Sequence, residues 1–128
     1  MDSRTIERLF RRHRILGKFE RSVRVEEFPQ PGDPLRLDYR YLFNGTRGYI
    51  QPVALERDPA QAKELAYTAE CIRARTPNSE FTAITEVEFA QGNLRHQFVA
   101  RLFEEQHISV VPLSRVEKFA EGLQSRLH

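Results

Sequence analysis

The stretch LRLDYRYLFNGTRGYIQPVAL, from Leu35 to Leu55, predicts a hairpin of two antiparallel strands. Apolar and polar side chains alternate on both sides of Asn44-Gly45, and this period of two is typical of half-buried strands. Asn-Gly favours a tight hairpin turn because both residues tolerate positive φ. The first strand carries the acid Asp38, and the second carries Gln51. Pro52 has no N–H to donate to a ladder, so it predicts an edge position or a bulge for the second strand.

The chain before the hairpin is predicted to form a helix and a strand. Apolar residues recur at helical spacing over residues 3–16, and Gly17 follows where a helix is expected to end. Residues 18–28 alternate as a half-buried strand. The segment 29–34, PQPGDP, breaks the chain and predicts a loop between strands.

Three helices and two strands are predicted after the hairpin. The helices are expected at 59–75, at 94–105 and after Ser114, and the strands at 81–89 and 108–113. Asp58 with Gln61, and Ser114 with Glu117, have the spacing of helix capping boxes. Residues 108–113 are apolar on both faces, which is typical of a buried parallel strand.

The predicted order of elements is therefore αβββαβαβα, in a single domain that spans residues 1–128. A length of 128 residues suits one hydrophobic core. Strands joined by short connections favour an antiparallel meander, and strands fed by helices favour parallel crossovers. We expect an α/β (α+β) fold with a mixed five-stranded sheet and helices on both faces.

The composition is that of a soluble globular protein, with 40% hydrophobic and 30% charged residues. No apolar run approaches the roughly 20 residues of a membrane helix. The first residues, MDSRTIERLF, lack the apolar segment of a secretory signal, so we expect a cytoplasmic protein. The single cysteine, Cys71, excludes an internal disulfide and a cysteine-cluster metal site.

Basic residues gather near the start of the chain, where seven of the 20 lysines and arginines precede Arg24. Four of them share the polar face of the first predicted helix: Arg4, Arg8, Arg11 and Arg12. This face is either a solvated helix surface or an edge that contacts phosphates, because few acids offset it. Arg36 and Arg40 flank Asp38 on the hairpin and are two further candidates for contact with phosphate.

The order of elements and the positions of Asp38 and Gln51 resemble the core of PD-(D/E)XK nucleases, over about residues 3 to 89. The resemblance implies a restriction-endonuclease-like core, with residues 90–128 as a C-terminal αβα extension. In that family, the second strand carries an acid, and the third carries an acid or glutamine followed two residues later by lysine. Here the triplet is Gln51-Pro52-Val53, so valine replaces the lysine.

The resemblance assigns a site to a few residues. Asp38, Gln51 and Glu7 on the first helix would hold Mg²⁺, and Lys63 on the following helix is the candidate to replace the missing lysine. One carboxylate and one amide on the hairpin hold Mg²⁺ poorly. Two simpler interpretations remain open: Asp38 as a surface acid paired with an arginine, and Gln51 as an ordinary strand residue.

Three hypotheses of function follow. The first is a catalytically inactive nuclease-fold protein that binds DNA, RNA or a protein partner, in mobile-element or phage-defence biology. The second is an active Mg²⁺-dependent nuclease that uses Asp38, Gln51 and Lys63. The third is a protein-interaction module or homodimer without a role at nucleic acid.

Overall fold

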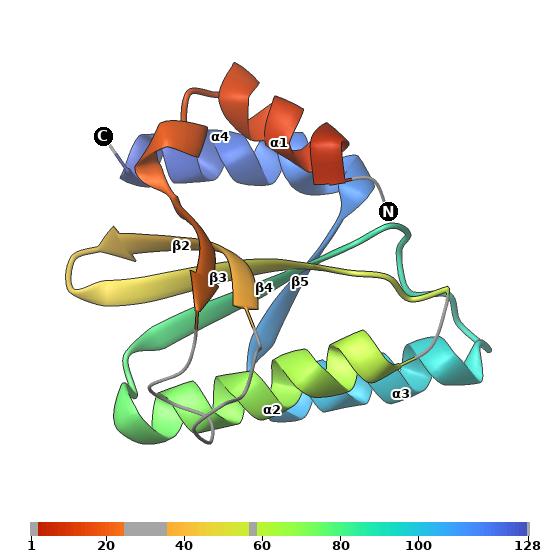
Figure 1. Ribbon diagram of the computed structural model, residues 1–128. Coiled ribbons are helices and arrows are strands. Elements are labelled where there is room, and N and C mark those ends of the chain that lie inside the picture. The colour runs from red at the N-terminus through yellow and green to blue at the C-terminus, as the bar shows by residue number, and fades with distance from the viewer. Residues whose placement is uncertain (1–2, 25–35, 57–58, 128) are drawn as a thin grey trace.

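One mixed sheet of five strands runs through the molecule, in the order β1-β2-β3-β4-β5 (Figure 1). The computed structural model describes residues 3–24, 36–56 and 59–127. The strands in these ranges are β1 (Glu20–Arg24), β2 (Arg36–Phe43), β3 (Thr46–Val53), β4 (Ser79–Thr85) and β5 (Ile108–Pro112). The predicted α+β fold with a mixed five-stranded sheet is confirmed.

Helices cover both faces of this sheet, as predicted. The helices α1 (Ser3–Arg12) and α4 (Val116–Arg126) lie on one face, and α2 (Ala60–Arg75) and α3 (Leu94–Glu105) lie on the other (Figure 1). Short 3₁₀ turns, η1 (Leu16–Lys18) and η2 (Leu113–Arg115), precede β1 and α4. The sheet therefore separates two helical layers, and each layer encloses its own part of the core.

The first three strands form the predicted antiparallel meander, and the last two strands are parallel to their neighbours. β1 pairs with β2 and β2 with β3 in antiparallel ladders, whereas β3–β4 and β4–β5 are parallel. The hairpin turns at Asn44 (φ 49°) and Gly45 (φ 80°), so both turn residues adopt the positive φ that the Asn-Gly pair predicted.

Two buried clusters make up the core. Between the sheet and α2/α3, the cluster includes Tyr49, Phe81 and Phe103. Between the sheet and α1/α4, it includes Phe10, Tyr39 and Tyr41, where Phe10 and Tyr39 meet edge to face at 5.1 Å. The tyrosines of β2 are thus core residues.

Several element boundaries differ from the prediction. The first helix ends at Arg12 and not at residue 16, because Arg14 takes a positive φ of 60° and turns the chain before Gly17. The first strand begins at Glu20, two residues after its predicted start, and the fourth runs from Ser79 to Thr85 where 81–89 was predicted. The predicted loop at 29–34, the end of the predicted strand 18–28 and the cap residue Asp58 lie outside the described residues.

Of the two positions predicted for Pro52, an edge strand or a bulge, the edge strand is wrong, because β3 is the central strand. The paired residues of β2 and β3 end at Tyr39 and Ile50, while β3 continues beside β4 to Val53. Pro52 lies in this continuation, where β2 no longer pairs. A residue without an N–H is tolerated there because no β2 partner requires a donor.

The side chains of Gln61 and Glu117, which the predicted capping boxes use, have partners elsewhere in the fold. The Gln61 side chain accepts a hydrogen bond from the Ala54 N–H at 2.8 Å. Glu117 contacts Arg12 and His13 of α1, at 3.5 and 3.3 Å. The residues before α2 and α4, Pro59 and Arg115, make no side-chain cap.

The C-terminal segment after β4 completes the same sheet. β5 pairs with β4 in parallel, as predicted, but it is an edge strand in which only Ile108 and Pro112 are buried. α4 packs against α1 across the layer. In the described part of the chain, no helix is long and apolar enough to cross a membrane.

Candidate functional site

The strands β2 and β3 separate at Asp38. Their paired residues end at Tyr39 and Ile50. At the next position, the Oε1 of Gln51 accepts a hydrogen bond from the Asp38 backbone N–H at 2.8 Å. A side chain therefore takes the place of the next ladder bond, and the hairpin is open at this end.

At this opening, the buried side chains of β2 switch from one face of the sheet to the other. Leu37 belongs to the cluster under α2/α3, whereas Tyr39, two residues later, belongs to the cluster under α1/α4. Residues two apart on a regular strand share a face, so the alternation is interrupted at Asp38. On the neighbouring edge strand, Ser22 has a φ of 53°. The backbone is thus irregular on both strands beside the acid.

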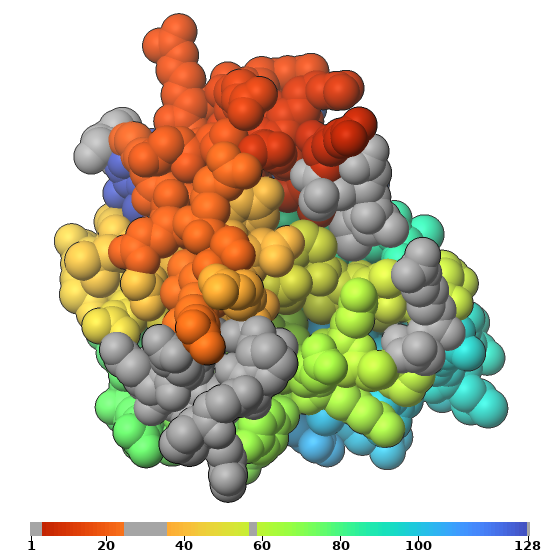
Figure 2. Space-filling model, in the orientation of Figure 1, coloured from red at the N-terminus to blue at the C-terminus, as the bar shows by residue number. Residues whose placement is uncertain are grey.

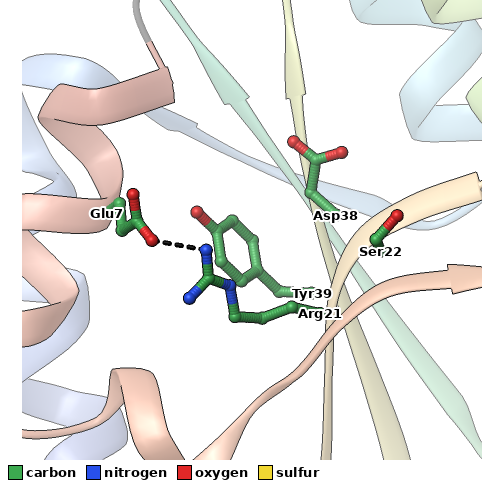
Figure 3. A pocket seen from close by; sticks show the side chains of 5 residues that line it. All are labelled: Glu7, Arg21, Ser22, Asp38 and Tyr39. Atoms are coloured by element: carbon green, nitrogen blue, oxygen red, sulfur yellow. Dashed lines mark hydrogen bonds and ion pairs between the residues drawn. The ribbon is translucent and has the colours of Figure 1, made fainter.

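A pocket of about 230 Å³ lies at this opening, between α1 and the ends of β1 and β2. It is lined by Glu7, Arg21, Ser22, Asp38 and Tyr39 (Figure 3). The Glu7 carboxylate points toward Arg21, and the Tyr39 ring lies between Glu7 and Asp38 in this view. The Asp38 carboxylate points away from this pair. The two acids share one pocket without converging.

Asp38 is a half-buried acid in this pocket. Burial raises the pKa of Asp38 above its ordinary value of 3.8, and a hydrogen bond from Gln51 offsets part of that effect. Among the ion pairs of the described residues, none joins Asp38 to an arginine. The interpretation of Asp38 as an arginine-paired surface acid therefore has no support in the described structure.

The raised pKa predicts how stability depends on pH. In the unfolded chain, Asp38 ionises near pH 3.8, whereas in the folded chain it ionises at a higher pH. Ionisation of Asp38 therefore destabilises the folded state. The stabilising contribution of the neutral acid is lost as pH rises through the raised pKa. We expect the Asp38→Asn variant to have a higher free energy of unfolding, and so to be more stable, than the wild type at pH 7. The difference should vanish below pH 3.8, as measured by urea titration.

The exposed Glu104→Gln change on α3 is the matched control, because it removes one carboxylate outside the pocket. As an exposed surface change, it should alter the free energy of unfolding at pH 7 by less than about 0.5 kcal/mol. A gain for Asp38→Asn that is the same at pH 3 and pH 7 would contradict the proposed cost of ionisation.

Glu7 joins α1 to the edge strand. Its Oε1 accepts a hydrogen bond from Arg21 of β1 and lies 3.8 Å from the Arg11 guanidinium, one turn along α1. Glu7 is thus neutralised by two arginines. These contacts place the basic surface of α1 directly beside the pocket that contains Asp38.

Gln51, Val53 and Lys63 do not complete a catalytic group around Asp38. Val53, at the position of the family's lysine, is 1% exposed in the core under α2/α3. The Lys63 ammonium lies 5.7 Å from the ring centroid of Phe98 on α3. Gln51 also lines a second hollow, of about 100 Å³, together with Arg36 and residues of α2, but Lys63 does not line it. The structure does not bring Lys63 to Asp38.

The predicted arginines fall into two groups. On α1, Arg4, Arg8, Arg11 and Arg12 are exposed, and Arg12 pairs with Glu117 of α4 at 3.5 Å. On β2, Arg36 donates a hydrogen bond to the Ser22 carbonyl at 3.1 Å, and Arg40 forms an ion pair with Glu20 directly across the ladder. Arg40 is therefore engaged within the sheet, while the α1 arginines face solvent.

The residues at the opening do not suit a magnesium ion. The Gln51 oxygen is bound to a backbone N–H, and the Glu7 oxygen is bound to Arg21, which leaves Asp38 as one carboxylate. Mg²⁺ requires near-octahedral oxygen coordination. The described residues contain no group of three or more histidines, cysteines or acids placed to hold a metal. We derive no metal-dependent step from this site.

Sequence patterns did not identify Arg21, Ser22 and Tyr39 as pocket residues. Tyr39 is a core residue, and Arg21 and Ser22 belong to a strand whose pairing register the sequence does not show. The register Arg21↔Tyr39 places both beside Asp38. Comparison of the chain with protein-family models, with curated proteins and with solved structures found no match.

Proposed function

We propose that this protein is a catalytically inactive nuclease-fold domain that binds nucleic acid through α1 and the adjoining edge of the sheet. The observation that carries the proposal is the opening at Asp38. The acid and the glutamine that the resemblance assigns to a metal site meet there, but the hydrogen bond from the Asp38 N–H occupies the Gln51 amide oxygen. Val53 stands at the position that the resemblance gives to the lysine, and its burial supports a domain without the nuclease chemistry.

The binding half of the proposal rests on an arginine surface, which we define as Arg4, Arg8 and Arg11 on α1 with Arg21 and Arg24 on β1. All five are exposed. Glu7 connects the two elements, because it contacts both Arg11 and Arg21. In Figure 2, the red and orange atoms of α1 and β1 adjoin on the face shown, from its top toward its centre. Guanidinium groups in such a row suit phosphates at regular spacing.

Nucleic acid has the right chemistry for this surface. A phosphate backbone presents repeated single charges, and arginines held by a helix and a strand can contact several of them at once. Asp38 would lie beside the bound backbone and repel phosphate from the pocket. The backbone is therefore expected to follow α1 and β1 and not to enter the opening.

Charge reversal on α1 tests the binding half. We expect Arg8→Glu combined with Arg11→Glu to weaken binding to labelled DNA or RNA by at least about tenfold in low salt, because two phosphate contacts become repulsive. The slope of log affinity against log salt should fall by about 2. Fluorescence anisotropy on single-stranded DNA, duplex DNA and RNA measures both quantities.

The matched control reverses the charge of two exposed arginines in the opposite helical layer, by Arg75→Glu on α2 and Arg101→Glu on α3. It makes the same change in net charge and should leave most of the binding intact. Equal loss in both variants, or no loss in the α1 variant, would reject α1 as the binding surface. Mg²⁺- or Mn²⁺-dependent cleavage that Asp38→Ala abolishes would reject the inactive half of the proposal.

A further inference from the structure

The Asp38 carboxylate offers hydrogen-bond acceptors to the pocket that it lines. A carboxylate accepts hydrogen bonds at two oxygens and donates none. Gln51 uses part of this capacity, and no ion pair among the described residues joins Asp38 to an arginine. Asp38 is half-buried in a hollow of about 230 Å³. The pocket therefore suits a ligand that brings N–H donors to this acid.

The charges around the pocket favour a neutral ligand. Asp38 repels a phosphate, while Arg11 and Arg21, which outnumber the Glu7 that they share, repel a free cation. The volume of about 230 Å³ is below the range of roughly 300–1,000 Å³ for drug-sized ligands. A single nucleobase is small, neutral and rich in N–H donors. Because Arg21 lines the pocket and belongs to the arginine surface, a strand bound there by its phosphates passes the mouth of the pocket.

Among the four bases of DNA, guanine has the edge that matches a carboxylate. On their Watson–Crick edges, adenine and cytosine place one N–H donor beside acceptors, and thymine places one donor between two carbonyls. Guanine alone presents two neighbouring donors, N1–H and N2–H, beside one acceptor, O6. Two neighbouring donors match the two oxygens of a carboxylate, which makes a bidentate contact.

Two hydroxyl groups in the same lining supply donors for the guanine O6. Ser22 and Tyr39 line the pocket together with Asp38. Figure 3 shows the Asp38 carboxylate between the Tyr39 hydroxyl and Ser22. Burial and the neighbouring charges of Asp38 and Glu7 raise the pKa of Tyr39, so its hydroxyl stays a donor. The lining thus combines acceptors for two donors with donors for one acceptor.

We propose that the pocket at Asp38 binds an unpaired guanine base of a single-stranded nucleic acid whose phosphates lie on the arginine surface. The inference rests on the proposed nucleic-acid binding and adds a base preference to it. Asp38 accepts hydrogen bonds from N1–H and N2–H, and the hydroxyl groups of Ser22 and Tyr39 donate to O6. In a duplex, cytosine occupies this edge of guanine, so the pocket selects single strands.

The base preference is measured by fluorescence anisotropy. A short labelled all-thymine DNA is compared with the same strand carrying one central guanine. We expect guanine to raise the affinity about tenfold, because a bidentate pair of hydrogen bonds discriminates between bases by about that factor. One adenine or cytosine at the same position should give no such gain. The gain should disappear when a complementary strand pairs the guanine with cytosine.

Base analogues identify the edge that is bound. Hypoxanthine lacks the N2 amino group and should keep only about a threefold gain, since one of the two donors is lost. 7-Deazaguanine lacks an acceptor on the opposite edge and should bind as well as guanine. Equal binding of hypoxanthine and guanine, or loss of the gain with 7-deazaguanine, would overturn the assignment of the Watson–Crick edge.

Replacement of the acid tests the role of Asp38. Asp38→Asn is expected to fold, because it removes the cost of ionisation, and its amide places a donor against one of the two guanine donors. The ratio of the affinities for the guanine strand and the all-thymine strand should fall from about ten to about one. Glu104→Gln, which removes an exposed carboxylate from α3, should keep the ratio of the wild type. An unchanged ratio in Asp38→Asn would overturn the inference.

The outcomes separate this inference from the proposed function. Binding of the all-thymine strand without a gain from guanine would overturn the guanine site and leave the arginine surface unaffected. Absence of binding to every strand would reject both. Free guanosine monophosphate should compete only weakly, because it lacks the neighbouring phosphates that the arginine surface holds. Competition as strong as that of the guanine strand would show that the ligand is a free nucleotide and would overturn the binding of a strand.

Discussion

Replacement of Gly48 with alanine is expected to lower the free energy of unfolding by about 3 kcal/mol, the upper end of the range for overpacked cores. Gly48 lies directly across the hairpin from Tyr41. A Cβ at residue 48 would come closer than 3.0 Å to three carbons of the Tyr41 ring. The ring and the added carbon cannot occupy the same space, so one of them must move.

Tyr41 cannot move without loss of other interactions. It is 4% exposed in the cluster under α1/α4, and its hydroxyl donates a hydrogen bond to Glu80 at 3.2 Å. Burial, with the neighbouring Glu80 charge, raises the pKa of Tyr41 to about 12. A displaced ring would lose both burial and this hydrogen bond. The strain therefore cannot be relieved by a simple rotation at the surface.

Urea titration measures this loss of stability. Gly17→Ala is the matched control, because a Cβ at residue 17 meets no atom within 4 Å. It should change the unfolding free energy by less than about 1 kcal/mol. If the clash with Tyr41 is the cause, Gly48→Ala combined with Tyr41→Ala should cost less than the sum of the two single changes. Additive losses would contradict the explanation.

Replacement of Arg73 with methionine is expected to cost about 2 kcal/mol, because a charged hydrogen-bond donor is lost from several backbone carbonyls. Arg73 of α2 donates to the carbonyls of Gln106 and His107, the latter at 2.8 Å, and to that of Ser79 at 3.3 Å. Its guanidinium also lies 4.9 Å from the Phe81 ring centroid.

These contacts hold the end of α3 where the chain enters β5. His107 has a φ of 52°, which turns the chain between the helix and the strand. Arg73 satisfies the carbonyls at this turn and joins it to the start of β4. Methionine keeps an unbranched apolar stem and removes the guanidinium with its charge and its donors. Arg73→Met should therefore loosen the turn more than it disturbs the core.

Chemical denaturation and amide hydrogen exchange at residues 106–112 measure the two consequences. Arg75→Met, at an exposed position on the same helix, is the control and should change stability by less than about 0.5 kcal/mol. Arg73→Lys should restore the charge without the fork of donors, and so recover only part of the loss. Full recovery by lysine would show that charge, and not hydrogen-bond geometry, stabilises the turn.

Local patterns predicted the elements because their causes lie within a few residues. Asn44-Gly45 makes a turn wherever two alternating strands flank it, and the spacing of apolar residues orients α2 and α3 toward the sheet. The predicted capping roles of Gln61 and Glu117 were wrong because contacts with distant segments decide where these side chains bind. Gln61 and Glu117 have suitable spacing for caps, but Ala54 and α1 offer them other partners in the folded chain.

The candidate site shows the same division. Sequence alone determined the order of elements, the hairpin, the acid on β2, the glutamine on β3 and the absence of lysine at residue 53, since each of these depends on residue identity and short-range periodicity. Only the tertiary structure decided that β3 is central, that Gln51 binds the Asp38 N–H where the strands separate, and that β5 is an edge. Those features depend on contacts between segments far apart in the chain, and residue spacing alone does not specify which strand will lie beside which.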